Sequence, residues 1–123
     1  MTDDVTTGAA VCRIDDLAGR KCVPCGGGVP RLTGAELERY ANSVAGWRLV
    51  DEHHLTKRYE FPDFRRAQEF VNRVGEIAEE EGHHPDIAFG WGYCDLKIFT
   101  HAIDGLSESD FILAAKIDRL DDR

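Results

Sequence analysis

The sequence predicts an α+β domain with two layers, in which a four-stranded antiparallel sheet carries three helices on one face. Apolar residues recur at helical spacing in three segments, and short segments that alternate between apolar and polar residues lie between them in pairs. The order is helix-strand-strand-helix-strand-strand-helix. Because closely spaced strands pair as hairpins, the sheet is antiparallel, and the helices must bury its apolar face. A chain of 123 residues is long enough for one such domain.

Three local signals predict where the helices begin and end. Thr33-Gly34-Ala35-Glu36 is a capping box that begins the first helix, and Gly46 ends this helix. Asp63 is the expected N-cap of the longest helix, which closes on Glu79-Glu80-Glu81-Gly82. The third helix is expected to start at Ser107, with an apolar stripe along it.

The strands follow from alternation between the helices. The first pair spans residues 47–52 and 55–61, and the second pair spans residues 87–93 and 95–101. In the last strand, Leu96, Ile98 and Thr100 share one face, and Lys97, Phe99 and His101 share the other. A polar turn joins the first two strands, and we expect its histidines, His53 and His54, to be exposed.

The segment before residue 32 is expected to be a partly disordered tail, and residues 32–123 to form the domain. Gly26-Gly27-Gly28 and two prolines punctuate this tail. It contains Cys22-Val-Pro-Cys25, a spacing typical of zinc knuckles and redox pairs. No second CxxC is present to complete a zinc site, and the glycines that follow do not predict the helix that a redox motif opens. We therefore assign no chemistry to this motif.

Composition and charge exclude several functional classes. Hydrophobic residues make up 42% of the chain and charged residues 31%, as in an ordinary globular protein. The net charge of -8 disfavours a nucleic-acid partner, because phosphate binding requires clustered Lys and Arg. No apolar run approaches the roughly 20 residues of a membrane span. The acidic N-terminus MTDDVTTGAA lacks a signal-peptide pattern, so we expect a cytoplasmic protein without a membrane partner.

A cluster of histidines is the strongest functional signal. Three of the five histidines, His83, His84 and His101, fall between the end of the longest helix and the end of the last strand. Pro85 stiffens the turn that follows the adjacent pair. One predicted strand leaves this turn and the next one ends at His101. Because these two strands are expected to pair, the three rings can lie close together. Imidazole both donates and accepts protons near neutral pH, which predicts acid-base catalysis.

Two carboxylates accompany this cluster, and each has two interpretations. Glu79 lies one turn before His83, among three carboxylates that oppose the helix dipole. It is either part of a solvated helix end or a group that helps to hold one histidine in its protonated form. Asp110 belongs to Ser107-Glu108-Ser109-Asp110, a variant of the capping box, yet it also lies on the inward face of its helix. Either capping or a role in the site explains it.

These residues resemble the pterin-4a-carbinolamine dehydratases. The family pattern is an acidic residue, three others, His-His-Pro, an aromatic residue, a third His, then Gly-Leu-Ser and an Asp. In this chain it is met by Glu79, His83-His84-Pro85, Trp91, His101, Gly105-Leu106-Ser107 and Asp110. The resemblance runs from about Leu32 to Leu120 and includes the segment from Tyr59 to Ala67. One departure is Ile87, which stands where many members carry Trp.

The resemblance implies a fold, a reaction and a set of roles. The reaction is loss of water from a 4a-hydroxytetrahydropterin to give the quinonoid dihydropterin. This activity would make the chain a hydro-lyase of tetrahydrobiopterin biosynthesis and recycling. An aromatic amino-acid hydroxylase would be its pathway partner. The subunit would assemble as a homodimer or homotetramer. The catalytic residues would be His83, His84 and His101, and the supporting or substrate-binding residues would be Glu79, Pro85, Trp91 and Asp110.

Proteins of this fold also act without catalysis, as a dimerisation cofactor of a transcription factor or as a Rubisco assembly factor. An assembly factor has no need to keep the three histidines. Because this chain has all of them, the enzyme is the favoured interpretation.

The reaction is expected to need neither a metal nor an organic cofactor. Adjacent histidines chelate one ion poorly, and the sequence shows no clear fourth ligand. Activity should therefore survive exhaustive chelation, measured on the purified protein. Stoichiometric zinc whose removal abolishes activity would contradict this prediction.

Overall fold

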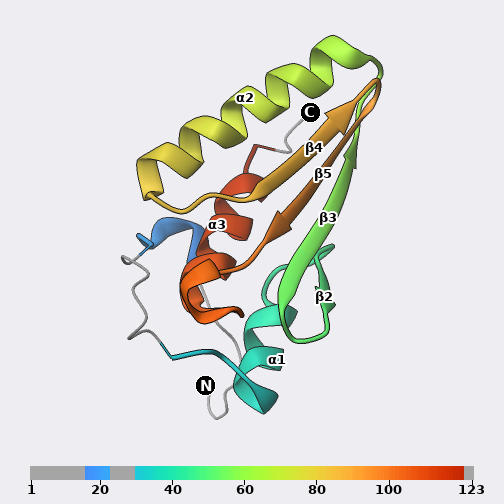
Figure 1. Cartoon of the computed structure of the whole chain (residues 1–123). Helices are drawn as coiled ribbons and strands as arrows, with labels where there is room; N and C mark the ends of the chain where they lie inside the picture. The colour runs from blue at the N-terminus through green and yellow to red at the C-terminus, as the bar shows by residue number, and fades with distance from the viewer. Residues whose placement is uncertain (1–15, 23–29, 121–123) are drawn as a thin grey trace, which may run out of the picture.

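The structure is a computed structural model that describes residues 16–22 and 30–120. Two short 3-10 turns, three helices and four strands form along it in the predicted order (Figure 1). Their bounds are η1 Leu17–Gly19, α1 Gly34–Asn42, β2 Arg48–Val50, β3 His54–Glu60, α2 Phe64–Glu81, β4 Asp86–Gly90, β5 Tyr93–Ile98, η2 His101–Ile103 and α3 Glu108–Asp118. The predicted α+β class is confirmed.

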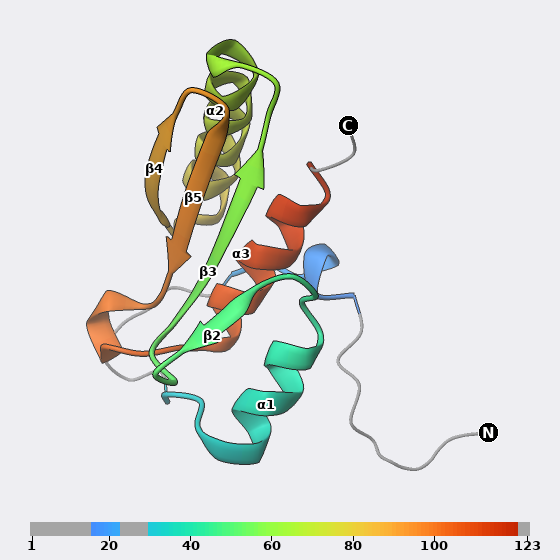
Figure 2. The same ribbon diagram turned by 90° about the vertical axis from the view of Figure 1, so that its right-hand side faces the viewer.

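The four strands form one antiparallel sheet in the order β2-β3-β5-β4. The central pair, β3 and β5, runs in register from Leu55 opposite Ile98 to Glu60 opposite Tyr93. Helices α2 and α3 lie behind the sheet in Figure 2, and α1 lies at its lower end, near β2. The edge strands are therefore β2 and β4, and one face of the sheet carries no helix from residues 16–22 or 30–120.

Alternation along the central strands decides which side chains enter the core. Leu55 and Tyr59 of β3 are buried together with Cys94, Leu96 and Ile98 of β5. Burial raises the pKa of the Cys94 thiol to about 11, so this cysteine stays protonated at neutral pH. The helices contribute further apolar side chains to the same core, among them Phe70, Val74, Phe111, Leu113 and Ile117.

Two of the three predicted helix starts have their expected side-chain caps. Asp63 accepts a hydrogen bond from the backbone nitrogen of Arg66 at 2.9 Å, and the cap of α3 at Ser107 is described below with the site. The predicted capping box at Thr33 is wrong. Thr33 is the N-cap of α1, but its side chain makes no capping hydrogen bond. Helix α1 also ends at Asn42, before the predicted stop at Gly46.

All four strands exist, but some of their predicted ends are wrong. Asp51 and Glu52 adopt positive φ, so the chain leaves β2 at Val50 rather than at residue 52. The second hairpin turns at Gly92, with a φ of 84°, which places Trp91 in the turn and not in a strand. The last strand ends at Ile98 because the chain folds back there, and Thr100 forms only an isolated bridge with Gly105. His101 therefore begins the 3-10 turn η2 and does not end a strand.

Part of the N-terminal tail packs against the domain. The segment Asp16–Cys22 contains η1, which contacts α3, and its Leu17 is only 4% exposed and belongs to the core. Cys12 and Cys25 lie outside the described residues. Among the described residues, no helix is long and apolar enough to cross a membrane.

Candidate active site

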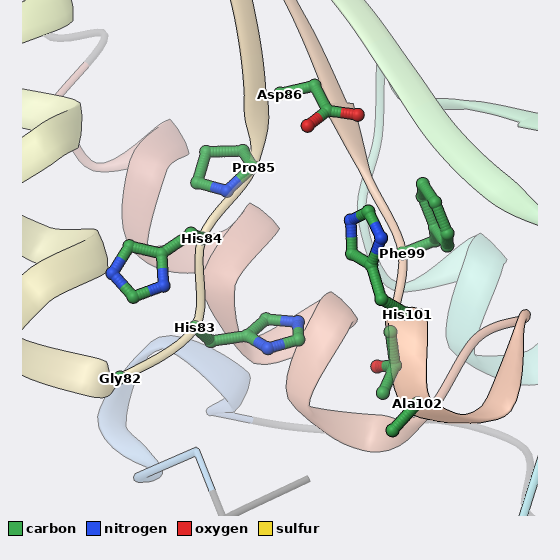
Figure 3. Close-up of a pocket in the computed structure, with 9 residues that line it drawn as sticks. Gly82, His83, His84, Pro85, Asp86, Phe99, His101 and Ala102 are labelled. Carbon is green, nitrogen blue, oxygen red and sulfur yellow. The ribbon is translucent and has the colours of Figure 1, made fainter.

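A cleft of about 410 Å³ opens between the end of α2 and the segment that follows β5. Figure 3 shows that its walls come from two stretches of chain, one before and one after the β4–β5 hairpin. The residues that line it are Gly82, His83, His84, Pro85, Asp86, Phe99, Thr100, His101 and Ala102. The structure therefore brings the three predicted histidines to one cleft.

The end of α2 decides where His83 lies. Gly82 caps the helix in the left-handed conformation, with a φ of 65°, which glycine adopts without steric cost. The backbone nitrogen of His83 then donates to the carbonyl of Ala78 at 3.1 Å. This bond holds His83 against the last turn of the helix, and its side chain is 7% exposed. In Figure 3 the ring points across the cleft toward the segment of His101.

A buried carboxylate holds His83. The Nε2 atom of His83 lies 2.5 Å from Oδ1 of Asp110, which is fully buried. The other carboxylate oxygen accepts from Thr100 Oγ1 and from the backbone nitrogen of Ser107, each at 2.8 Å. With Asp110 ionised, Nε2 carries the proton, and Nδ1 of the neutral ring is left as the proton acceptor. The pair thus selects one tautomer of His83.

Asp110 makes contacts of both kinds that its two interpretations require. It occupies the third position of α3 and accepts from the backbone of the N-cap residue Ser107, as a capping box requires. Its second oxygen simultaneously contacts His83. The N-terminal end of a helix also favours a negative charge. One buried carboxylate therefore both begins α3 and orients a histidine of the cleft.

Glu79 contacts a different histidine from the one that its position in the sequence indicated. Its Oε2 atom accepts from Nε2 of His84 at 2.6 Å, whereas His83 is bound to Asp110. Adjacent residues on an extended segment point in opposite directions, so the ring of His84 lies on the other side of its segment, toward α2 (Figure 3). Both side chains of this pair are largely exposed. Solvent therefore weakens their attraction.

His101 lies on the opposite wall and stacks on Phe99, with ring centroids 4.1 Å apart. Behind Phe99 lies the ring of His53 at 4.5 Å, whose Nε2 contacts Oδ1 of Asp104 at 2.7 Å. That hydrogen bond holds the pKa of Asp104 below its ordinary value. His53 was predicted to be exposed, and this is wrong. It is half-buried because its ring packs on Phe99 and contacts Asp104.

The same turn half-buries His54, which was also predicted to be exposed. Burial lowers the pKa of His54, and the nearby charge of Lys97 lowers it further. Trp91 is the predicted site residue that the structure places elsewhere. It is 71% exposed in the β4–β5 turn, at the other end of β4 from Pro85. Within one subunit it is not part of the cleft.

Among the cleft residues that sequence reasoning missed are Thr100, Phe99 and Asp86. Thr100 could have been found, because it is the polar residue on the strand face that carries Leu96 and Ile98. Nothing in the local pattern marked the other two. In the described part of the chain, no group of three or more His, Cys, Asp or Glu side chains is arranged to hold a metal ion.

Comparison with known proteins agrees with this geometry. Residues 30–120 match the family model described as pterin 4 alpha carbinolamine dehydratase. The chain belongs to this family. The match includes every residue of the cleft and excludes the segment Asp16–Cys22.

Bacterial relatives carry the same family name. A protein of Rubrobacter xylanophilus, whose name places it among the pterin-4-alpha-carbinolamine dehydratases, is 61% identical over 107 residues, which cover 87% of this chain and all of the relative. A relative in Alkaliphilus metalliredigens with the same name is 44% identical over 107 residues, 86% of this chain and 96% of its own.

Two solved structures share the fold. A transcriptional coactivator/pterin dehydratase from Brucella melitensis is 29% identical, with a TM-score of 0.70 over 74% of this chain and 98% of its own. A pterin dehydratase-like protein identified as a RuBisCO assembly factor in the alpha-carboxysome is 27% identical, with a TM-score of 0.53 over 61% of this chain and 88% of its own.

Proposed function

We propose that this protein dehydrates 4a-hydroxytetrahydropterins to quinonoid dihydropterins. The reaction breaks the bond between C4a and its hydroxyl group and forms a double bond between C4a and N5. One proton must reach the departing oxygen, which leaves as water, and one proton must leave N5. Two imidazoles with opposite proton roles meet this need, and each such transfer is typically worth about 10²- to 10⁴-fold in rate.

The observation that carries the proposal is the arrangement of His83 and His101 on facing walls of one cleft. The contact with Asp110 leaves Nδ1 of His83 as a proton acceptor. His101 can donate from the other wall, where Phe99 supports its ring. His84 is exposed beside the cleft and suits binding of the substrate edge more than proton transfer.

A stopped-flow assay on a synthetic 4a-hydroxytetrahydropterin tests the proposal. The substrate also loses water in buffer, so the measured quantity is the rate above that background at several enzyme concentrations. A rate proportional to enzyme concentration is the expected result. A rate equal to that of buffer at every concentration would reject the activity.

The alternative is a non-enzymatic partner, and the two solved relatives named for coactivation and Rubisco assembly support it. The His83–Asp110 contact favours the enzyme, because a docking surface has no need of a buried pair that selects a tautomer. A protein that is folded but inactive in the assay would favour the partner role.

Self-association is the second part of the proposal, and strand β4 is its expected site. Among the residues that the structure describes, no strand neighbours the outer side of β4, where Asp86, Ile87 and Ala88 are exposed. Unpaired strand edges favour pairing with another chain, and closed symmetry is the usual result. The face without helices is less suitable because it carries charged pairs such as Arg58 with Asp95.

A two-fold pair of β4 strands centred on Ala88 would also explain Trp91. In that register Asp86 faces the partner's Gly90, so no like charges are opposed. If the pairing extends one residue beyond Asp86 and Gly90, the partner subunit's Trp91 lies across from Pro85, beside the cleft. The exposed tryptophan would then serve the neighbouring subunit's site.

The assembly should therefore depend on Ile87, at the exposed edge. The wild type should scatter light as a dimer or tetramer of the 13.8 kDa subunit at micromolar concentration. Ile87→Lys should give a monomer, because it places a charge within the paired edge. Val50→Lys on the other edge strand, β2, is the control and should not change the mass. A monomeric wild type would refute the prediction, and a monomer with Val50→Lys alone would move the interface to β2.

A further inference from the structure

The segment Asp16–Cys22, here called the N-terminal strap, lies outside the family match and still packs into the core. The 107 aligned residues of the Rubrobacter relative exceed the length of chain from residue 30 to its end. That relative therefore also has part of the segment before residue 30. Leu17 anchors the strap, and Arg20 forms an ion pair with Glu108 at the first residue of α3.

The end of the strap touches both elements that carry the His83–Asp110 pair. The backbone nitrogen of Cys22 donates to Oε1 of Glu81 at 2.9 Å, and Glu81 is the last residue of α2, two positions before His83. The Sγ atom of Cys22 lies 3.5 Å from the carbonyl oxygen of Ser109, which precedes Asp110. One residue thus bridges the helix end behind the histidine and the first turn of the helix that holds the carboxylate.

The contact with Glu81 is partly buried and involves a charged side chain. The side chain of Glu81 is 4% exposed, and its other oxygen lies 3.3 Å from Nζ of Lys116 on α3. Donation from Cys22, and then Lys116, hold the pKa of Glu81 below its ordinary value. A carboxylate at the C-terminal end of a helix opposes the helix dipole, and these two partners offset that unfavourable interaction.

We propose that the N-terminal strap is a positioning element for the His83–Asp110 pair, because it sets the end of α2 relative to the start of α3. Without the strap, Glu81 keeps only Lys116, a flexible side chain, and the two helix ends can separate. A 2.5 Å hydrogen bond does not survive such a separation. The inference rests on the proposed function only where activity is the readout.

Two pairs of variants test the proposal in the full-length chain. Leu17→Ala removes the anchor of the strap, and Leu37→Ala, the matched control, removes the same atoms from the core side of α1. Glu81→Leu breaks both the strap contact and the ion pair. Lys116→Met breaks the ion pair alone, so the difference between these two variants isolates the contact with Cys22.

Two readouts separate positioning from general loss of stability. Leu17→Ala and Glu81→Leu should lower kcat about 10-fold with KM changed less than about 2-fold, because misplaced catalytic groups slow chemistry while the cleft lining stays in place. The imidazole Nε2–H proton of His83 should give a downfield nuclear magnetic resonance signal in the wild type. This signal should broaden beyond detection in the same two variants, because the proton then exchanges with water. Both controls should keep the signal and the kcat.

The resonance readout does not require activity. If the wild type fails to dehydrate the pterin but the signal behaves as expected, the proposed function fails and the positioning role stands. If Leu17→Ala and Glu81→Leu match their controls in both signal and kcat, the strap is only a stabilising segment and the inference is overturned.

Discussion

Replacing His101 by alanine should lower the rate of pterin dehydration by at least about 10-fold and up to about 10²-fold, with the fold intact. His101 is exposed at the cleft and its ring stacks on Phe99, so its loss leaves no buried charge without a partner. His83→Gln should cost as much. Glutamine can still donate a hydrogen bond to Asp110, but its amide cannot accept a proton near neutral pH.

Stopped-flow rates above the buffer background, with circular dichroism as the check on folding, measure this effect. His84→Ala is the informative comparison, because its ring is held by exposed Glu79 on the other side of the segment. It should raise KM more than it lowers kcat. Wild-type rates in both the His101 and His83 variants would reject the assignment of proton transfer to this pair.

Asp110→Asn should lower the rate about 10²-fold or more and cost only about 1 kcal/mol of stability, because the negative charge at the N-terminal end of α3 is lost while the capping hydrogen bonds remain. The remaining oxygen of the asparagine must accept from Thr100 and from the Ser107 backbone, so its amide nitrogen faces His83. That nitrogen donates, which forces the imidazole proton to Nδ1. In serine proteases, the equivalent substitution acts through the wrong tautomer in the same way.

Asp110→Ala should be worse for stability, by about 3 kcal/mol, because three donors then lose a buried acceptor. Asp118→Asn is the matched control on the same helix. Asp118 also accepts from several side chains, among them Tyr59 and Lys57, but lies away from the cleft. Denaturant unfolding should show a comparable loss for the two asparagine variants, and only Asp110→Asn should lose activity. Equal rates in both would leave Asp110 as a cap and nothing more.

Element order and type could be predicted because each depends on local pattern. Helix α2 begins at Asp63 and ends at Gly82 as expected, since both signals act within one turn of the chain. Strand ends could not be predicted as well. They depend on where the neighbouring strand ends and on backbone conformations such as the positive φ of Asp51 and Glu52, which their residue types do not announce.

By itself, the sequence determined the family, the order of the helices and strands, and the three histidines of the cleft. Only the tertiary structure decided which carboxylate serves which histidine. Along the chain Glu79 lies nearer to His83 than Asp110 does, yet Glu79 contacts His84. His83 instead contacts Asp110, which belongs to α3. The tertiary structure also places Trp91 outside the cleft of its own subunit, and it packs the strap into the core. The His83–Asp110 pair joins two helix ends that only the tertiary fold brings together. Periodicity indicates the face on which a side chain lies and not its partner.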